Sequence, residues 1–315
     1  MTASPDTAAR RGRVLDYPWP LIPESSDRPV WTGHGFRVGA KHLGVLSYEA
    51  GQSNWTDELT TFHEDTAGSG HPIDRASREL ALSGLATAPS DAPLILEVGC
   101  SSGFMLMMAR QRLPGARWIG SDYVRGPLEK LAVDVPELPL LHFDLRACPL
   151  PDASVDAVLL LNVLEHIDDD ALAMRQVYRI LRPGGVAVIE VPAGPELFDV
   201  YDELLMHHRR YTRSDLRQVL ESSGFMIARF THLGTFIYPP FYLVKQWNKR
   251  YLSRTKAAQR RVVARSIQTT RSNPLLSALL GLELRLGRTS TGRSESGAPW
   301  SLRSRTPLSA RDRPF

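Results

Sequence analysis

Short aliphatic runs alternate with helical segments between Ala92 and Leu233, and this alternation restricts the possible folds more than any other feature of the chain. It predicts βαβ units, and hence an α/β fold with a mostly parallel sheet and helices on both faces. The expected strands are Leu94–Val98, Arg117–Asp122, Leu140–Asp144, Asp156–Asn162, Val186–Pro192 and Phe225–His232. The expected helices between them are Phe104–Leu113, Pro127–Asp134, Asp169–Leu181 and Arg213–Ser222.

Local signals support these boundaries. Thr212 precedes the helix at Arg213, with Asp215 three residues on, as in a helix N-cap. Outside the regular region, Pro72–Leu85 and the Leu-rich Pro274–Arg288 are predicted helices, and a last strand is expected near Trp300–Arg303.

The chain therefore divides into a core with two extensions. Residues 1–30 are rich in Pro, Ser and Arg and are expected to be mobile. Residues 31–90 form an N-terminal extension, in which Trp55–His63 is interpreted either as a lid or as a surface helix. Residues 91–235 form the predicted core, and 236–315 form a basic C-terminal extension.

Charge is distributed unevenly along the chain. Residues 245–315 hold 16 Lys/Arg and 3 Asp/Glu, whereas residues 1–244 hold 22 and 31. A basic segment favours an anionic partner, such as phospholipid, a phosphorylated substrate or RNA, although a solvated tail has the same composition. The aromatic and then basic run at 236–250 suits either a membrane interface or a substrate-pocket wall.

The sequence gives little indication of targeting to a membrane or of export. No apolar run is long enough for a signal peptide or a transmembrane helix. Only two cysteines occur, Cys100 and Cys148, which is typical of a reducing compartment. We expect a cytoplasmic protein that can meet the inner face of the membrane through residues 236–265.

The segment LILEVGCSSG, residues 94–103, predicts a ligand site. A strand ends near Glu97, passes Gly99 and Gly103, and opens a helix, so a ligand can approach the backbone and the helix N-terminus. Asp122 ends the next strand, where a carboxylate can accept hydrogen bonds from ribose hydroxyls. Asp144 and Asn162 end the following two strands, and all four strand ends lie at one edge of a parallel sheet.

At this point the sequence resembles class I S-adenosylmethionine-dependent methyltransferases. EVGCSSG, SDYV, HFDL, LLLNVLEHIDD and LRPGGVAVIEVP carry the resemblance over about residues 90–235. It implies a Rossmann-like seven-stranded sheet with a reversed final hairpin, and S-adenosyl-L-methionine as cofactor. The cofactor-binding residues that it implies are Glu97, Gly99, Ser101, Gly103, Asp122, Tyr123, Asp144, Leu145 and Asn162. Ser101 departs from the pattern, because the family has a glycine there.

A narrower resemblance follows the fifth strand. Asp202 and the run His207 to Thr212 look like a bacterial subgroup with an H-x-R-R-Y-T motif, often met near surface-polysaccharide, lipid-linked or natural-product pathways. We therefore expect methyl transfer to oxygen or carbon of a small-molecule or lipid- or sugar-linked acceptor. Arg209 and Arg210 are interpreted either as an anion clamp or as partners of Asp202 and Glu203.

Two histidines are the candidate catalytic bases. His166 follows the fourth strand, and His207 lies on the segment expected to cover the pocket. Either could remove a proton from the acceptor, and either could be structural. The nine histidines show no metal-ligand spacing, so no metal is expected.

Other functions fit the sequence less well. GCSSG also matches the G-x-S-x-G turn of α/β-hydrolases, but this leaves Asp122 and Asp144 unexplained. The glycine spacing of dinucleotide dehydrogenases fails at Ser101 and Phe104. A non-catalytic S-adenosylmethionine-binding regulator keeps the same fold. An RNA methyltransferase is disfavoured, because no aromatic and basic stacking platform is evident.

Overall fold

The computed structural model describes residues 15–23, 25–48, 70–271, 273–289 and 300–305. The strands are β1 (Val30–Trp31), β2 (Phe36–Val38), β3 (Lys41–Leu43), β4 (Val45–Ser47), β5 (Leu94–Val98), β6 (Arg117–Asp122), β7 (Leu140–His142), β8 (Val155–Leu161), β9 (Leu181–Val191), β10 (Met226–His232) and β11 (Trp300–Arg305). The helices are α2 (Pro72–Leu85), α3 (Phe104–Arg112), α4 (Arg125–Asp134), α5 (Asp170–Ile180), α6 (Val200–Leu204), α7 (Arg213–Ser222), α8 (Tyr238–Asn248), α9 (Lys256–Arg271) and α10 (Pro274–Thr289). The proposed lid Trp55–His63 lies outside the described residues.

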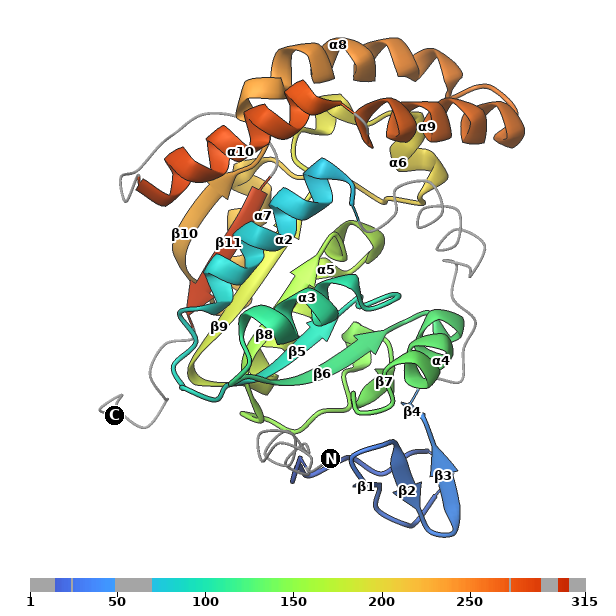
Figure 1. Cartoon of the computed structure of the whole chain (residues 1–315), viewed down its shortest axis with the longest axis vertical. Helices are drawn as coiled ribbons and strands as arrows, with labels where there is room; N and C mark the ends of the chain where they lie inside the picture. The colour runs from blue at the N-terminus through green and yellow to red at the C-terminus, as the bar shows by residue number, and fades with distance from the viewer. Residues whose placement is uncertain (1–14, 24, 49–69, 272, 290–299, 306–315) are drawn as a thin grey trace, which may run out of the picture.

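The main sheet confirms the predicted α/β architecture. Among the described residues it has eight strands in the order β10-β11-β9-β8-β5-β6-β7-β4 (Figure 1). The strands from β9 to β4 pair in parallel, while β11 is antiparallel to both of its neighbours and forms the expected reversed strand. The sheet has one strand more than the seven expected, because β4 of the N-terminal extension adds to the β7 edge. Its three residues are too few for an alternating pattern to be read.

Each face of the sheet carries its own core. Leu94, Leu96 and Val98 of β5 share a buried cluster with α5 and α7, whereas Ile95 shares a second cluster with α2, α3 and α4. Successive strand residues point to opposite faces, so this split follows directly from the period of two. The two helical layers thereby hold the strand ends between them, together with the site residues that the sequence predicted there.

The stretch of residues 15–19, which precedes β1, is more ordered than its composition indicates. Residues 1–30 were expected to be mobile, but Leu15, Tyr17 and Trp19 are buried in the main core. The Tyr17 hydroxyl donates to Ser154 Oγ at 2.8 Å. Leu15, Tyr17 and Trp19 hold this stretch against the sheet, because each of them buries a large apolar area.

The C-terminal extension folds into three helices, of which the sequence predicted only α10. Pro239 and Pro240 occupy the first turn of α8, where proline leaves no intrahelical hydrogen bond unmade. Figure 1 shows α8 and α9 at the end of the molecule opposite the small sheet β1-β2-β3. Helix α9 packs on α6 through Val263 and Ile267, and α10 packs on α2 through Leu276 and Leu280. Within the described residues, no helix has the length and apolarity needed to span a bilayer.

Candidate functional site

The predicted bend between β5 and α3 is present and tight. Gly99 and Gly103 have φ of +77° and +76°, and a Cβ on Gly99 would lie 2.6 Å from Val163 Cγ2. Ser101, which stands where the resembled methyltransferases have a glycine, also adopts a positive φ of 46°. For a residue with a side chain this costs roughly 1–2 kcal/mol, so the surrounding bend imposes the conformation.

Asp122 lies against this bend, as the sequence predicted. Its Oδ2 accepts a hydrogen bond from the Ser101 backbone N–H at 2.8 Å, and its Oδ1 accepts one from Val124 N–H at 2.8 Å. These donors fix the carboxylate at the wall of a large cavity that Asp122 lines. The hydrogen bond from Ser101 to Asp122, at the end of β6, also satisfies the backbone N–H of the strained Ser101.

Glu97 is buried beside Asp122 without a complete set of partners. It is 3% exposed, and its Oε2 has no hydrogen-bond donor among the described residues. Burial and the nearby Asp122 raise the pKa of Glu97 well above its usual range, while Arg78 opposes the shift. A buried acceptor of this kind costs free energy unless a donor from outside the chain completes it.

Asp144 is held by the short turn that follows it. Its carboxylate caps the short turn Leu145–Ala147 by accepting from Arg146 N–H at 2.8 Å. It also pairs with the Arg146 guanidinium, with Nη2 2.6 Å from Oδ2. Arg146 was not among the predicted site residues, since a side chain two positions along is not expected to fold back on an aspartate. Asp144 and Leu145 nevertheless line the cavity.

The remaining predicted cofactor residues, Tyr123 and Asn162, line the same cavity. Asn162 has φ of +54°, and its backbone N–H donates to the Glu190 carbonyl at 3.0 Å. The Asn162 side chain and Ser77 Oγ both donate to the Glu190 carboxylate, the latter at 2.8 Å. Glu190 therefore ties the strand ends to helix α2.

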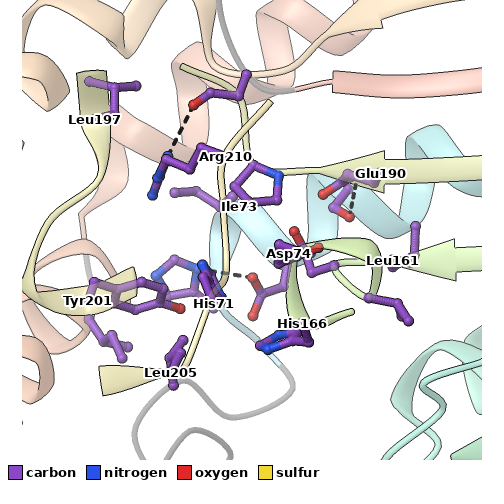
Figure 2. A pocket seen from close by; sticks show the side chains of 18 of the residues that line it. His71, Ile73, Asp74, Leu161, His166, Glu190, Leu197, Tyr201, Leu205 and Arg210 are labelled. Atoms are coloured by element: carbon purple, nitrogen blue, oxygen red, sulfur yellow. Dashed lines mark hydrogen bonds and ion pairs between the residues drawn. The ribbon is translucent and has the colours of Figure 1, made fainter. Parts of the chain in front are cut away.

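A single cavity of about 1390 Å³ joins these residues to the C-terminal helices. Pockets for one small ligand measure about 300–1,000 Å³, so this cavity can hold two molecules. Figure 2 shows His71, Asp74, His166, Tyr201 and Arg210 around one pocket, contributed by the start of α2, the turn after β8 and the α6 region.

The two predicted histidines meet in this cavity. The ring centroids of His166 and His207 lie 4.7 Å apart in an edge-to-face arrangement. His207 Nδ1 is 2.8 Å from Asp202 Oδ1, which leaves Nε2 as its other ring nitrogen. Burial lowers the pKa of His207, against the opposing effect of Asp202. A neutral imidazole oriented by a carboxylate is the arrangement of a general base or of a metal ligand.

Glu165, adjacent to His166, was not predicted as a site residue. It is fully buried, and neither carboxylate oxygen has a hydrogen-bond partner among the described residues. Burial raises the pKa of Glu165 to about 8. One ligand atom from each of Glu165, His166 and His207 lies within 4.8 Å of the others. The only sequence signal was a glutamate beside His166 after the fourth strand, which without the fold is indistinguishable from an ordinary turn residue.

A buried charge network supports the second histidine. Asp202 accepts from the Asp199 backbone N–H in a capping box at the start of α6. It also pairs with Arg210 Nε at 2.8 Å and Lys245 Nζ at 3.3 Å, and Lys245 lies 2.7 Å from Asp199. The hydrogen bond with His207, together with these cations, holds the pKa of Asp202 well below its usual range, against the effect of burial. Lys245 of α8 was missed, because nothing in its sequence neighbourhood indicates burial.

The arginine pair makes structural contacts. Arg210 pairs with Asp202, as one interpretation of the sequence held, whereas Arg209 Nη1 lies 2.8 Å from Asp170 Oδ2 and not beside Glu203. The Tyr211 hydroxyl donates to the same Asp170 oxygen at 2.7 Å. Both guanidinium groups are therefore occupied by carboxylates of this chain.

Part of the chain is similar to known methyltransferase domains. Residues 96–189 match the family model described as a methyltransferase domain. A Mycolicibacterium smegmatis protein named "Probable S-adenosylmethionine-dependent methyltransferase" is 33% identical over 135 residues, 42% of this chain and 52% of that protein. The trans-aconitate 2-methyltransferase of an Azoarcus species is 34% identical over 119 residues, 38% of this chain and 45% of that protein. The chain thus spans about half the length of the curated relatives it matches.

The fold is that of the Rossmann-like methyltransferases. The solved phosphoethanolamine N-methyltransferase 2 of Haemonchus contortus aligns with a TM-score of 0.52 over 82% of this chain and 59% of its own. At 16% identity, this similarity concerns the fold alone.

Proposed function

We propose that this chain is an S-adenosylmethionine-dependent methyltransferase whose acceptor is a small or lipid- or sugar-linked molecule with an apolar part. One observation carries the proposal. A single cavity joins the glycine bend and Asp122 at one wall to the Glu165, His166 and His207 cluster and the C-terminal helices at another. The methyltransferase domain match over residues 96–189 supports the cofactor half of this assignment.

The residues at the bend fit this cofactor. Asp122 would accept from the ribose hydroxyls, and the orphaned Oε2 of Glu97 would accept from the cationic amino group. Asp144 and the Leu145 backbone would meet the adenine, with Arg146 holding the aspartate in place. Bound there, the cofactor supplies an electrophilic methyl group on a sulfonium, so the chain must chiefly align the acceptor with it.

The acceptor half of the cavity favours an apolar molecule. Its wall is formed by Leu233, Phe241, Val263, Leu276 and Leu280, contributed by the end of β10 and by α8, α9 and α10. An apolar wall binds by area removed from water, at about 25 cal/mol per Å². The relatives' names do not share an acceptor, so the apolar wall carries this part of the proposal.

The candidate bases lie between the two halves. His207 is the better oriented, because Asp202 holds its Nδ1 and its ring is 6% exposed on the cavity wall. Acting directly, His207 or His166 would take the hydroxyl proton of an oxygen acceptor as the oxygen attacks the methyl carbon. Proton removal of this kind contributes about 10²- to 10⁴-fold in rate.

The proposal is tested by methyl transfer from labelled S-adenosylmethionine to hydroxylated acceptors that differ only in alkyl chain length. We expect S-adenosylhomocysteine to form, with kcat/KM rising as the chain lengthens. Equal kcat/KM for short and long acceptors would contradict the apolar acceptor site. Tight cofactor binding with no turnover on any acceptor would favour a non-catalytic regulator.

Helix α8 supports a contact with an anionic membrane surface. Leu243 and Trp247, one helical turn apart, are 68% and 60% exposed. Residues 236–265 contain eight Lys/Arg and no Asp/Glu. Lys245 is buried against Asp199, and each of the other cations that lies near an anionic surface contributes about 1 kcal/mol. A lipid-linked acceptor would reach the cavity from such a surface, because α8 also forms the cavity wall.

Vesicle sedimentation tests this contact. The protein should bind vesicles containing phosphatidylglycerol more tightly than pure phosphatidylcholine vesicles, and Leu243→Ser with Trp247→Ser should weaken that binding. Leu21, an exposed leucine in the N-terminal part, supplies the matched control Leu21→Ser, which should bind as the wild type does. Equal binding to both kinds of vesicle would rule out an electrostatic contact.

A further inference from the structure

We propose that Glu165, His166 and His207 bind a divalent transition metal in the cavity, with two imidazoles and one carboxylate as ligands. The proposal departs from the sequence, which showed no ligand spacing. Glu165 and His166 are adjacent in the turn after β8, while His207 comes from the segment after α6. Only the fold brings them together.

The geometry suits a single ion. The three ligand atoms lie within 4.8 Å of one another, so one point exists at most about 2.8 Å from all of them. Bonds from zinc to imidazole or carboxylate measure about 2.0–2.2 Å, so a small side-chain rotation closes the site. Three protein ligands leave a coordination position open, as in catalytic rather than structural sites.

Glu165 gives the independent reason to expect a cation. Its side chain is fully buried, and both oxygens lack a donor from the described residues. A carboxylate with no donor on either oxygen is costly in a protein interior. A cation bound between it and the two imidazoles would supply the missing partner, whereas another apolar ligand would not.

His207 is already oriented as metal-binding histidines are. Asp202 Oδ1 lies 2.8 Å from Nδ1, and a carboxylate on one ring nitrogen fixes the tautomer and raises the basicity of the other. The capping box at the start of α6 holds Asp202 in turn. This carboxylate–histidine arrangement leaves Nε2 for the metal.

The surrounding charges also favour a cation. Three buried carboxylates, Glu165, Asp199 and Asp202, face two buried cations, Arg210 and Lys245. With the histidines neutral and Glu165 deprotonated, as metal binding requires, these five groups carry a charge of −1, and a divalent ion would bring their sum to +1. The position open on the metal therefore suits an anionic oxygen ligand.

The role of the ion rests on the proposed function. An acceptor hydroxyl on the open position would have a lowered pKa and would lose its proton to water. Its oxygen lone pair would then form the bond to the methyl carbon while the carbon–sulfur bond breaks, and that electron pair stays on sulfur as a neutral thioether. The histidines would act as ligands, and the metal would replace the free base.

Titration of the chelator-treated full chain with Co²⁺, Zn²⁺ and Mn²⁺ tests the site, by visible absorption for Co²⁺ and by calorimetry for the others. We expect one ion per chain. Glu165→Gln and His207→Gln should each weaken binding by about 100-fold or more, since even outer partners of metal ligands contribute about 10- to 100-fold. His42 is an exposed histidine of the small sheet, and His42→Gln should bind as the wild type does.

The outcomes separate the two proposals. Loss of metal binding in Glu165→Gln with unchanged S-adenosylmethionine affinity supports the site and shows that the variant is folded. Wild-type metal affinity in both variants, or no binding by the wild type, overturns it. Full methyl transfer by metal-free protein overturns the metal's role and leaves the methyltransferase proposal standing. Metal binding without any cofactor binding refutes the methyltransferase proposal alone.

Discussion

Replacing Glu97 by glutamine should weaken cofactor binding without weakening the fold. The substitution keeps the shape of the side chain and removes its charge. None of the described residues donates a hydrogen bond to Oε2 of Glu97, and burial raises the pKa of Glu97, so an ionised Glu97 costs stability in the ligand-free protein. Because the pKa of Glu97 is raised in the folded protein, this loss of stability appears as the pH rises above 4.5, the pKa of the carboxyl group in the unfolded chain. Glu97→Gln should therefore unfold at equal or higher denaturant concentration at pH 8.

The same substitution removes one charge-assisted hydrogen bond to the cofactor's amino group. Such bonds contribute about 1.5–3 kcal/mol, so the dissociation constant of S-adenosylmethionine should rise about 10- to 150-fold. Calorimetry measures this change. As a matched ligand, 5′-methylthioadenosine lacks the amino acid portion, and its affinity should change less than about twofold between wild type and variant.

These two ligands decide whether the reasoning about Glu97 is sound. Equal weakening of both would mean that Glu97 supports the bend and not the amino group. Unchanged binding of S-adenosylmethionine would mean that the orphaned oxygen does not face the cofactor at all.

Four further variants probe the supporting structure by denaturant unfolding. Gly103 has φ of +76°, and a Cβ there would lie 2.8 Å from Leu131 Cδ1, so Gly103→Ala should cost about 2–4 kcal/mol of stability. Gly184 has a similar φ but open space around it, so Gly184→Ala should cost only about 1–2 kcal/mol. Equal costs for the two variants would contradict the close packing at Gly103. Burial raises the pKa of Glu190 from 4.5 to about 7, so wild-type stability falls as the pH rises through that window. Glu190→Gln should therefore be about 3 kcal/mol more stable at pH 8, and this gain should shrink between pH 7 and 4.5 and be absent below pH 4.5; a pH-independent difference would contradict this. Lys245→Met leaves the buried carboxylate of Asp199 without its cation and should cost about 3–5 kcal/mol of stability. A loss below about 1 kcal/mol would mean that water reaches this charge network.

The sequence predicted the core elements because their signals are local. Strands β5 and β6 and helices α2 and α7 begin and end where the apolar runs, Thr212 and the prolines indicated. Helix α9 and strand β4 were missed. The first has a weak apolar stripe that becomes meaningful only against α6, and the second is three residues that pair only because β7 offers an edge.

The candidate site divides in the same way. The glycine bend and Asp122 were predictable, because a backbone turn and a strand-end carboxylate lie at fixed places in a parallel sheet. Arg146 and Lys245 were not predictable, because their partners lie across a turn or on another element. Burial of Glu165 without a hydrogen-bond partner is a property of packing, which no local pattern encodes.

The sequence alone determined the α/β architecture and the acidic strand ends beside a tight glycine bend, since periodicity and turn chemistry act over a few residues. Tertiary structure alone decided that the C-terminal helices wall the cavity and that His207 meets Glu165 and His166. The segments that carry Glu165 and His207 are about forty residues apart, and they come together only when the sheet and its helices bury their apolar faces. Charged groups that are buried in this way are stable only next to a partner of opposite charge or a hydrogen-bond partner.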